Sequence, residues 1–416
     1  MSFSFTSWAQ AFKHYQNPRV FSMIFFGILS GIPFLLTLAT MNVWLTQLGF
    51  STKTIGGLAF IQLPYAFRFL WSPFIDQYSI PFLTRWIGKR RSWLILSQIG
   101  LILSVIGMSQ TNPVDHLTLF GVFGFCIAFF SATQDLVLGG YRIEVLAPEH
   151  QGNGTAALYI GYRIGLMISG SGAFYLSSLF PWSTVYVMMS VLLALGFIVI
   201  ILNPEGESKQ KENFQNSYFS IVADVIKDLL KKHQWVNILI FILLYKAGDS
   251  IFGAYTSVFL SKVGFSNVDI AQANLLGVPF SILGGFLGGI LISKYDSLNT
   301  FKLCGVLQIA TCVILIIQYF VGTYKPMIFV VVAVEHFYLG IGGVTFYSFL
   351  ATLCTSAHTA TQYAVLLSFG SLSRIIASGI AGYVATLVSW DYFFFITAFS
   401  GVLYIMLLNR MGKLNN

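Results

Sequence analysis

Long apolar runs, separated by short polar segments, make up most of the chain between residues 20 and 409. Each run is long enough to cross a hydrocarbon core of roughly 30 Å as an α-helix that rises about 1.5 Å per residue. The pattern predicts twelve transmembrane helices, over residues 20–45, 54–75, 92–110, 117–141, 154–179, 183–203, 236–261, 268–293, 301–320, 327–351, 362–388 and 391–409. We therefore expect an all-α integral membrane protein whose first helix is retained, because no cleavage site follows it.

A polar stretch over residues 204–235 interrupts this pattern after the sixth predicted helix. It separates an N-terminal six-helix bundle, residues 1–203, from a C-terminal six-helix bundle, residues 236–416. Two repeated halves with a substrate site between them are typical of secondary transporters. Within this linker an apolar stripe predicts an amphipathic helix on the cytoplasmic membrane surface, formed by Phe219, Val222, Ile226, Leu229 and Leu230.

Composition and charge agree with a chain embedded in a lipid bilayer. Hydrophobic residues make up 56% of the chain and charged residues 9%, against about 25% charged residues in soluble domains. Lys and Arg concentrate at both termini and in the loops on that side, whereas the opposite loops hold only Lys53, Lys262 and Lys325. This asymmetry predicts that both termini are cytoplasmic. The net charge of +8 is then topological, and no nucleic-acid partner is expected.

Seven charged side chains fall well inside the predicted spans, away from the span ends, where a charge costs roughly 2.5 to 3.5 kcal/mol and usually faces a polar interior. They are Arg68, Asp135, Arg163, Lys246, Asp249, Glu335 and Arg374. Such residues are functional candidates by default.

The basic candidates have two interpretations each. Aligning Arg163 with Arg374 places GYRIGLMISGSGAFYL beside LSRIIASGIAGYVATL, so the fifth and eleventh helices are equivalent. These two arginines either bind cargo or close a cytoplasmic gate. Arg68 either binds cargo or extends toward the interface. Lys246 and Asp249 are three residues apart, so they either neutralise each other or open to an anionic ligand.

The acidic candidates differ in their predicted partners. Asp135 either serves transport or is satisfied by Arg142, seven positions later on the same helix. Glu335 has no opposite charge within its own helix, which favours a proton carrier. Its neighbour His336 is interpreted as a residue of a helix contact.

Other patterns predict close helix packing and argue against enzyme chemistry. Small residues at helical spacing indicate close helix approach, namely Gly161, Gly165 and Ser169, and Gly284, Gly285, Gly288 and Gly289. No nucleophile with a base occurs, and the four cysteines lack metal-ligand spacing. We expect no enzyme, no metal and no cofactor.

Seven motifs occur in the order SATQDLVLGGYRIE, GYRIGLMISGSGA, YKAGDSIFGAY, GGFLGGILI, VEHFYLGIGGVTF, TATQYAVLLSF and SRIIASGIAGY. With the earlier GILSGIPFLLT and LPYAFRFLWSPFIDQY, they resemble AmpG-type muropeptide permeases of the major facilitator superfamily over nearly the whole chain. The resemblance implies a twelve-helix facilitator fold. It also implies proton symport of anhydro-muropeptides across the bacterial inner membrane for peptidoglycan recycling, by alternating access of a monomer.

For this function we predict which residues meet the cargo and which carry protons. The substrate-binding residues are predicted to be Arg68, Gln134, Arg163, Lys246, Gln362 and Arg374. The proton-coupling residues are predicted to be Asp135, Asp249 and Glu335. Arg can grip a cargo carboxylate through two parallel hydrogen bonds.

Two positions depart from the AmpG pattern, and other functions stay open. Gly139 stands where relatives usually have an acid, and Asn274 where they usually have a lysine. We interpret these changes as the loss of a charge pair. The alternatives are a diverged facilitator for another anionic conjugate, such as an acyl-coenzyme A or a siderophore, and a sensor that does not transport.

Overall fold

The computed structural model describes residues 17–50, 54, 58–206, 223, 225, 227–231, 234–354 and 359–413. Over these residues the chain is helical and contains no strand. The N-terminal elements are α2 (Pro18–Leu36), α3 (Ala39–Gln47), η2 (Leu58–Gln62), α5 (Leu63–Phe67), η3 (Arg68–Leu70), α6 (Ser72–Gln77), α7 (Leu83–Ile87), α8 (Lys89–Gln110), α9 (Leu117–Val145), η4 (Pro148–His150), α10 (Gln151–Met167), the π-helical turn η5 (Ile168–Gly172), α11 (Ala173–Ser177), α12 (Trp182–Ala194) and α13 (Gly196–Leu202). The C-terminal helices are α15 (Trp235–Val263), α16 (Asn267–Val321), α17 (Lys325–Thr352), α18 (Thr359–Leu387) and α19 (Trp390–Lys413).

Each predicted span falls on these helices, which confirms the all-α membrane fold. Seven helices of the described chain are long and apolar enough to cross a membrane by themselves, over Pro18–Leu45, Lys89–Gln110, Leu117–Val145, Trp182–Leu202, Gln272–Val321, Lys325–Thr352 and Trp390–Arg410. The predicted eighth and ninth spans both lie on α16, whose backbone breaks at Asp296 with φ 71° and ψ 172°. The second predicted span consists of short pieces, with Pro64 and Pro73 in the first turns of α5 and α6. Proline lacks the N–H that a continuous helix needs there.

The chain forms two compact units. One, the N-unit, contains His14–Val225 together with Leu353–Val365, and the other, the C-unit, contains Ile226–Thr352 and Leu366–Asn416. Helix α18 therefore begins in the N-unit and continues in the C-unit. The predicted limits at residues 203 and 236 stay a prediction. Most of the predicted amphipathic stripe, including Phe219, Val222 and Ile226, lies outside the described residues.

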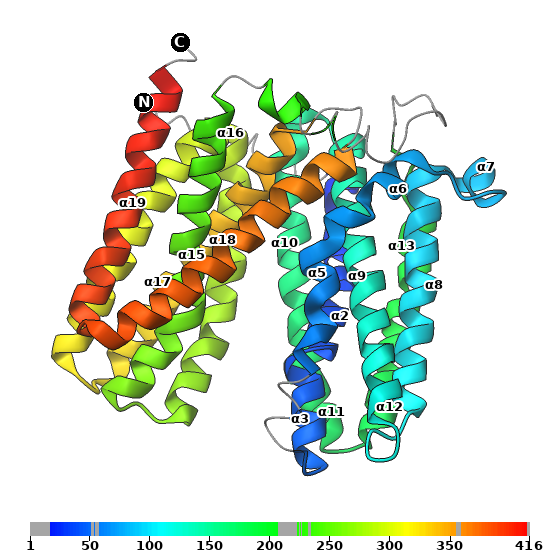
Figure 1. Cartoon of the computed structure of the whole chain (residues 1–416), viewed down its shortest axis with the longest axis horizontal. Coiled ribbons are helices and arrows are strands. Elements are labelled where there is room, and N and C mark those ends of the chain that lie inside the picture. The colour runs from blue at the N-terminus through cyan, green and yellow to red at the C-terminus, as the bar shows by residue number, and fades with distance from the viewer. Residues whose placement is uncertain are drawn as a thin grey trace. The chain divides into compact units, whose positions relative to one another are not determined.

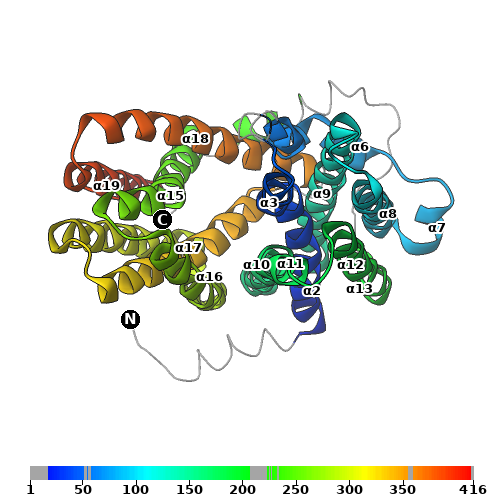
Figure 2. The same ribbon diagram turned by 90° about the horizontal axis from the view of Figure 1, so that it is seen from below.

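The long helices of each unit run side by side (Figure 1), and several N-unit helices, including α8, α10 and α12, are seen nearly end-on in Figure 2. Two apolar clusters fill the N-unit. One surrounds Trp44, Phe120 and Tyr186, and the other contains Phe26 and Tyr141. The C-unit has its own cluster around Phe259 and Phe394. Each unit therefore has a separate hydrophobic core.

Glycines bring α2 and α10 into backbone contact. Gly27 and Gly31 of α2 face Gly161 and Gly165 of α10, and a Cβ at any of the four would overlap a carbonyl oxygen of the opposite helix. In the C-unit, a Cβ at Gly284 of α16 would likewise overlap the carbonyl oxygen of Phe337. These contacts confirm the close packing that the small residues predicted.

Substitution of Gly161 by Ala should lower the thermal stability of the purified protein. The added Cβ would meet the main-chain oxygen of Ile24, so the helices must separate, at a cost of about 1 to 3 kcal/mol. Gly172→Ala is the matched control, because the nearest atom to its Cβ is the Met167 oxygen at 3.5 Å. Equal unfolding temperatures for the two variants would show that the α2–α10 contact is not tight.

Candidate functional site

Asp135, near the middle of α9, belongs to a polar cluster inside the N-unit. Its Oδ1 accepts a 2.5 Å hydrogen bond from Ser30 Oγ of α2. Arg68 of η3 acts electrostatically on both Asp135 and Tyr65 of α5. The Arg68 Nε is buried without a hydrogen-bond partner among the described residues. Asp135 and Arg68 therefore share one site, and Ser30 and Tyr65, which were not predicted as site residues, belong to it.

Arg142 does not satisfy Asp135, so that interpretation is wrong. The Arg142 side chain is fully buried, and its Nη1 donates a hydrogen bond to Thr155 Oγ1 of α10. Its guanidinium also lies 5.9 Å from the centre of the Tyr363 ring. Asp135 is thus available for a role other than pairing with Arg142.

Arg163 and Gln134 have partners within the N-unit. The guanidinium of Arg163 donates to the Tyr159 hydroxyl through Nε at 3.0 Å and Nη2 at 2.6 Å, and it lies 5.1 Å from the centre of that ring. The buried Gln134 donates to the side-chain oxygen of Gln98, whose amide donates to the Leu193 oxygen at 2.6 Å. Gln362 is also fully buried. Substrate binding by these residues stays a prediction.

Aromatic side chains surround Lys246 in the C-unit. Its Nζ is 2.6 Å from Asp249 Oδ2, one turn later on α15, which confirms the pair predicted from their spacing. The same Nζ lies 4.5 Å from the centre of the Phe346 ring and 6.0 Å from that of Tyr347. Arg374, on α18, is exposed and acts electrostatically on Lys246. Basic and aromatic groups therefore gather here.

Glu335 is buried in α17, with 4% of its surface exposed. It interacts with the Thr256 side chain and lies near Cys312, and no salt bridge to it occurs among the described residues. A carboxyl group in such a place is less costly to bury when neutral than when ionised. Its neighbour His336 contacts the Val332 oxygen at 3.0 Å and packs on Gly277, as expected for a residue of a helix contact.

Gly139 has a local structural cause. A Cβ there would lie 2.7 Å from the ring of Tyr363, so the aromatic ring takes the space of a side chain. Asn274 donates weakly to Ser257 Oγ at 3.5 Å within the C-unit. The loss of Gly139 and Asn274 as a charge pair stays a hypothesis.

A second charged cluster joins α6, α8 and α9. The buried Arg90 lies 2.9 Å from Asp76 Oδ1 and 2.6 Å from Glu144 Oε1. Asp76 also accepts hydrogen bonds from the backbone N–H groups of Ala360 and Thr361, at 3.3 and 2.7 Å, and so caps the start of α18.

Glu205, in the segment that follows α13, completes this cluster, because it accepts from the backbone N–H of Arg90 at 2.6 Å and of Arg91 at 3.1 Å. Burial raises the pKa of the Glu205 carboxyl above its ordinary value, and these two hydrogen bonds offset only part of that rise. Only the stretch from Asp76 to Arg91 of this cluster is local in the sequence. Its partners Glu144 and Glu205 lie too far along the chain for spacing to show them.

Comparison with known proteins gives one consistent result. Residues 66–378 match the Major Facilitator Superfamily. The chain is 33% identical to the putative transporter AmpG 3 of Rickettsia prowazekii (strain Madrid E), over 94% of this chain and 95% of that protein. It is 30% identical to the anhydromuropeptide permease of Escherichia coli (strain K12), over 96% of this chain and 81% of that protein.

Solved structures agree in fold at much lower sequence identity. The chain is similar to the facilitator FucP in its outward conformation, with a TM-score of 0.72 and 14% identity, over 95% of this chain and 99% of that one. It is also similar to the human organic anion transporter MFSD10, with a TM-score of 0.71 and 14% identity, over 94% and 99% of the two chains.

Proposed function

Because the chain belongs to the Major Facilitator Superfamily and, within it, to the AmpG family of transporters, we propose that it imports anhydro-muropeptides across the bacterial inner membrane, driven by protons. The chain is a membrane transporter and not an enzyme. The observation that carries the cargo assignment is the 30% identity to a permease named for anhydromuropeptides, over 96% of this chain.

The intramembrane side chains suit an anionic sugar-peptide. Arg163 with Tyr159 offers a cation beside an aromatic ring in the N-unit. Lys246 with Tyr347, near Arg374, offers the same chemistry in the C-unit. Cationic donors bind cargo carboxylates, and aromatic rings lie against sugar or peptide. We propose these groups as the binding residues, with Arg68 as a further cation beside Asp135.

Proton coupling is part of the proposal because of the charge of the cargo. Moving one negative charge inward against an inside-negative potential costs roughly 2.3 kcal/mol per 100 mV, so accumulation needs accompanying protons. Glu335 is the proposed first carrier because it is buried without a salt bridge among the described residues. Asp135 is the second, and Asp249 is less suited because Lys246 pairs with it.

Replacing Arg163 or Arg374 by Lys should weaken cargo binding clearly. Lys keeps the charge but loses the planar fork that makes two parallel hydrogen bonds to a carboxylate. Binding of labelled anhydro-muropeptide to each purified variant measures the effect. Unchanged affinity with altered turnover would instead assign both arginines to a gate.

Cells that lack their own muropeptide permease test the cargo. Expression of this chain should restore uptake of labelled anhydro-muropeptide, and an excess of an acyl-coenzyme A or a siderophore should not compete. Uptake of either compound in labelled form, without muropeptide uptake, would assign the transporter to another anionic conjugate. Absence of all uptake, with the protein present in the membrane, would favour a sensor.

A further inference from the structure

The segment between α6 and α8 carries the two most exposed large hydrophobic side chains in the described part of the chain. Phe82 is 84% exposed and Trp86 is 87% exposed. They lie four residues apart, Phe82 directly before α7 and Trp86 within it, and together they form an exposed aromatic face. Packing within the N-unit does not account for this aromatic face.

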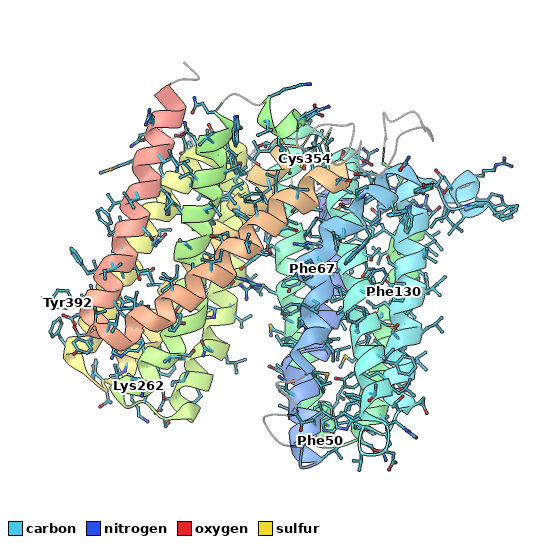
Figure 3. All side chains as sticks on the ribbon, viewed as in Figure 1. Phe50, Phe67, Phe130, Lys262, Cys354 and Tyr392 are labelled. Atoms are coloured by element: carbon cyan, nitrogen blue, oxygen red, sulfur yellow. The ribbon has the colours of Figure 1, made fainter. Side chains whose placement is uncertain are left out.

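The position of α7 is at the boundary of the membrane. Only Gly88 separates it from Lys89, where the apolar span of α8 begins. The Lys89 Nζ donates to the backbone oxygens of Asp76 at 2.6 Å and Gln77 at 3.3 Å, which holds the start of α8 against the end of α6. Helix α7 projects sideways from α8 at the edge of the N-unit (Figure 1), and its side chains stand clear of the other helices there (Figure 3).

The charges around α7 and the backbone conformation of Phe82 also favour contact with a membrane surface. Residues 77–110 contain no acid, and the exposed Arg85 lies beside the aromatic face. The basic residues that follow α7 place this boundary on the cytoplasmic side. Phe82 has φ 64° and ψ −52°, a conformation that non-glycine residues adopt only at a cost in free energy. Such strain persists where a particular side-chain direction serves a role.

We propose that α7 is an interfacial anchor for the cytoplasmic leaflet of the bilayer. Trp86 and Phe82 insert between lipid head groups and the first part of the acyl chains, where amphipathic aromatic rings are favoured. Arg85 binds a lipid phosphate. The anchor fixes the cytoplasmic end of α8 relative to the membrane surface. This inference requires a membrane-spanning chain but does not depend on the cargo.

Tryptophan fluorescence in reconstituted vesicles tests the anchor. The full chain and its Trp86→Phe variant are placed in phosphatidylcholine vesicles, and the difference of their emission spectra reports Trp86 alone. We expect the Trp86 emission to be shifted to the blue of tryptophan in water. Lipids brominated near the head group should quench it more than lipids brominated near the chain end, and aqueous iodide should quench it little.

The matched control is Trp93→Phe, whose difference spectrum reports a half-buried ring with Nε1 bonded to the Tyr78 oxygen at 2.9 Å. The proposal is overturned if Trp86 emission is quenched by iodide and by neither brominated lipid. The helix would then lie in water, where it could meet a soluble partner. Arg85→Gln should reduce the quenching of Trp86 by the shallow bromines. Unchanged quenching would show that Arg85 makes no contact with a lipid phosphate.

Discussion

Replacing Glu335 by Gln should abolish proton-driven accumulation of cargo while sparing cargo exchange at equal pH on both sides. The carboxyl group is buried in α17 with 4% exposure, beside Thr256 and Cys312. Gln keeps its shape and polarity but cannot carry a proton. Without an accompanying proton, each negative charge on the cargo must enter against the inside-negative membrane potential, which costs roughly 2.3 kcal/mol per 100 mV. Uptake by proteoliposomes with and without an inward proton gradient measures both activities.

Two further variants decide which acid carries the proton. Glu149→Gln, at an exposed position in η4, is the matched control and should behave like the unchanged protein. Asp135→Asn tests the second candidate, which Ser30 and Arg68 hold in the N-unit. If gradient-driven accumulation survives in both Glu335→Gln and Asp135→Asn, neither residue couples transport to protons.

Replacing Asp76 by Ala should lower the thermal stability of the protein more than any exposed substitution. The change removes one partner of the buried Arg90 and the cap at the start of α18, where Asp76 Oδ2 accepts from the backbone N–H and the hydroxyl of Thr361 at 2.7 and 2.8 Å. Lost hydrogen bonds to a charged group and a lost cap together cost about 3 kcal/mol. Glu144 still pairs with Arg90 and prevents a larger loss.

Asp269→Ala is the control for this prediction, because Asp269 also combines an ion pair with a helix start. Its Oδ1 lies 2.8 Å from Lys325 Nζ, and its side chain and that of Ser266 form a capping box at α16. The Lys325 side chain is largely exposed, and exposed pairs contribute about 0 to 1 kcal/mol. Thermal unfolding should therefore separate the two variants. Similar unfolding temperatures would mean that the Asp76 cluster adds little to stability.

Hydropathy and local spacing predicted the elements that depend on short stretches of sequence. A span in lipid must satisfy its own backbone, so each long apolar run has to be helical, and the described helices confirm this. The Lys246–Asp249 pair follows from three-residue spacing on one helix and is present. The glycine contacts between α2 and α10 were predicted on the α10 side by the spacing of Gly161 and Gly165.

Contacts between distant segments could not be predicted from spacing. Arg142 is the basic residue nearest to Asp135 in the sequence, yet the hydrogen-bond donor of Asp135 is Ser30, 105 residues away. Which face of α9 meets α2 depends on helix packing and not on the sequence of α9 alone. The hydrogen bonds around Asp76 and Arg90 likewise join segments that only the fold brings together. The glycine at position 139 likewise depends on a distant segment, because the Tyr363 ring, in the early part of α18, occupies the space that a side chain there would need.

We propose that this transporter carries anhydro-muropeptide together with protons. Purified protein in proteoliposomes, given labelled anhydro-muropeptide and an inward proton gradient, tests it most directly. We predict accumulation above the outside concentration, which collapses when a protonophore removes the gradient and is absent in Glu335→Gln. Accumulation that persists in the presence of the protonophore would contradict the coupling of transport to protons. No entry of muropeptide, by protein that still transports another anionic conjugate, would contradict the cargo.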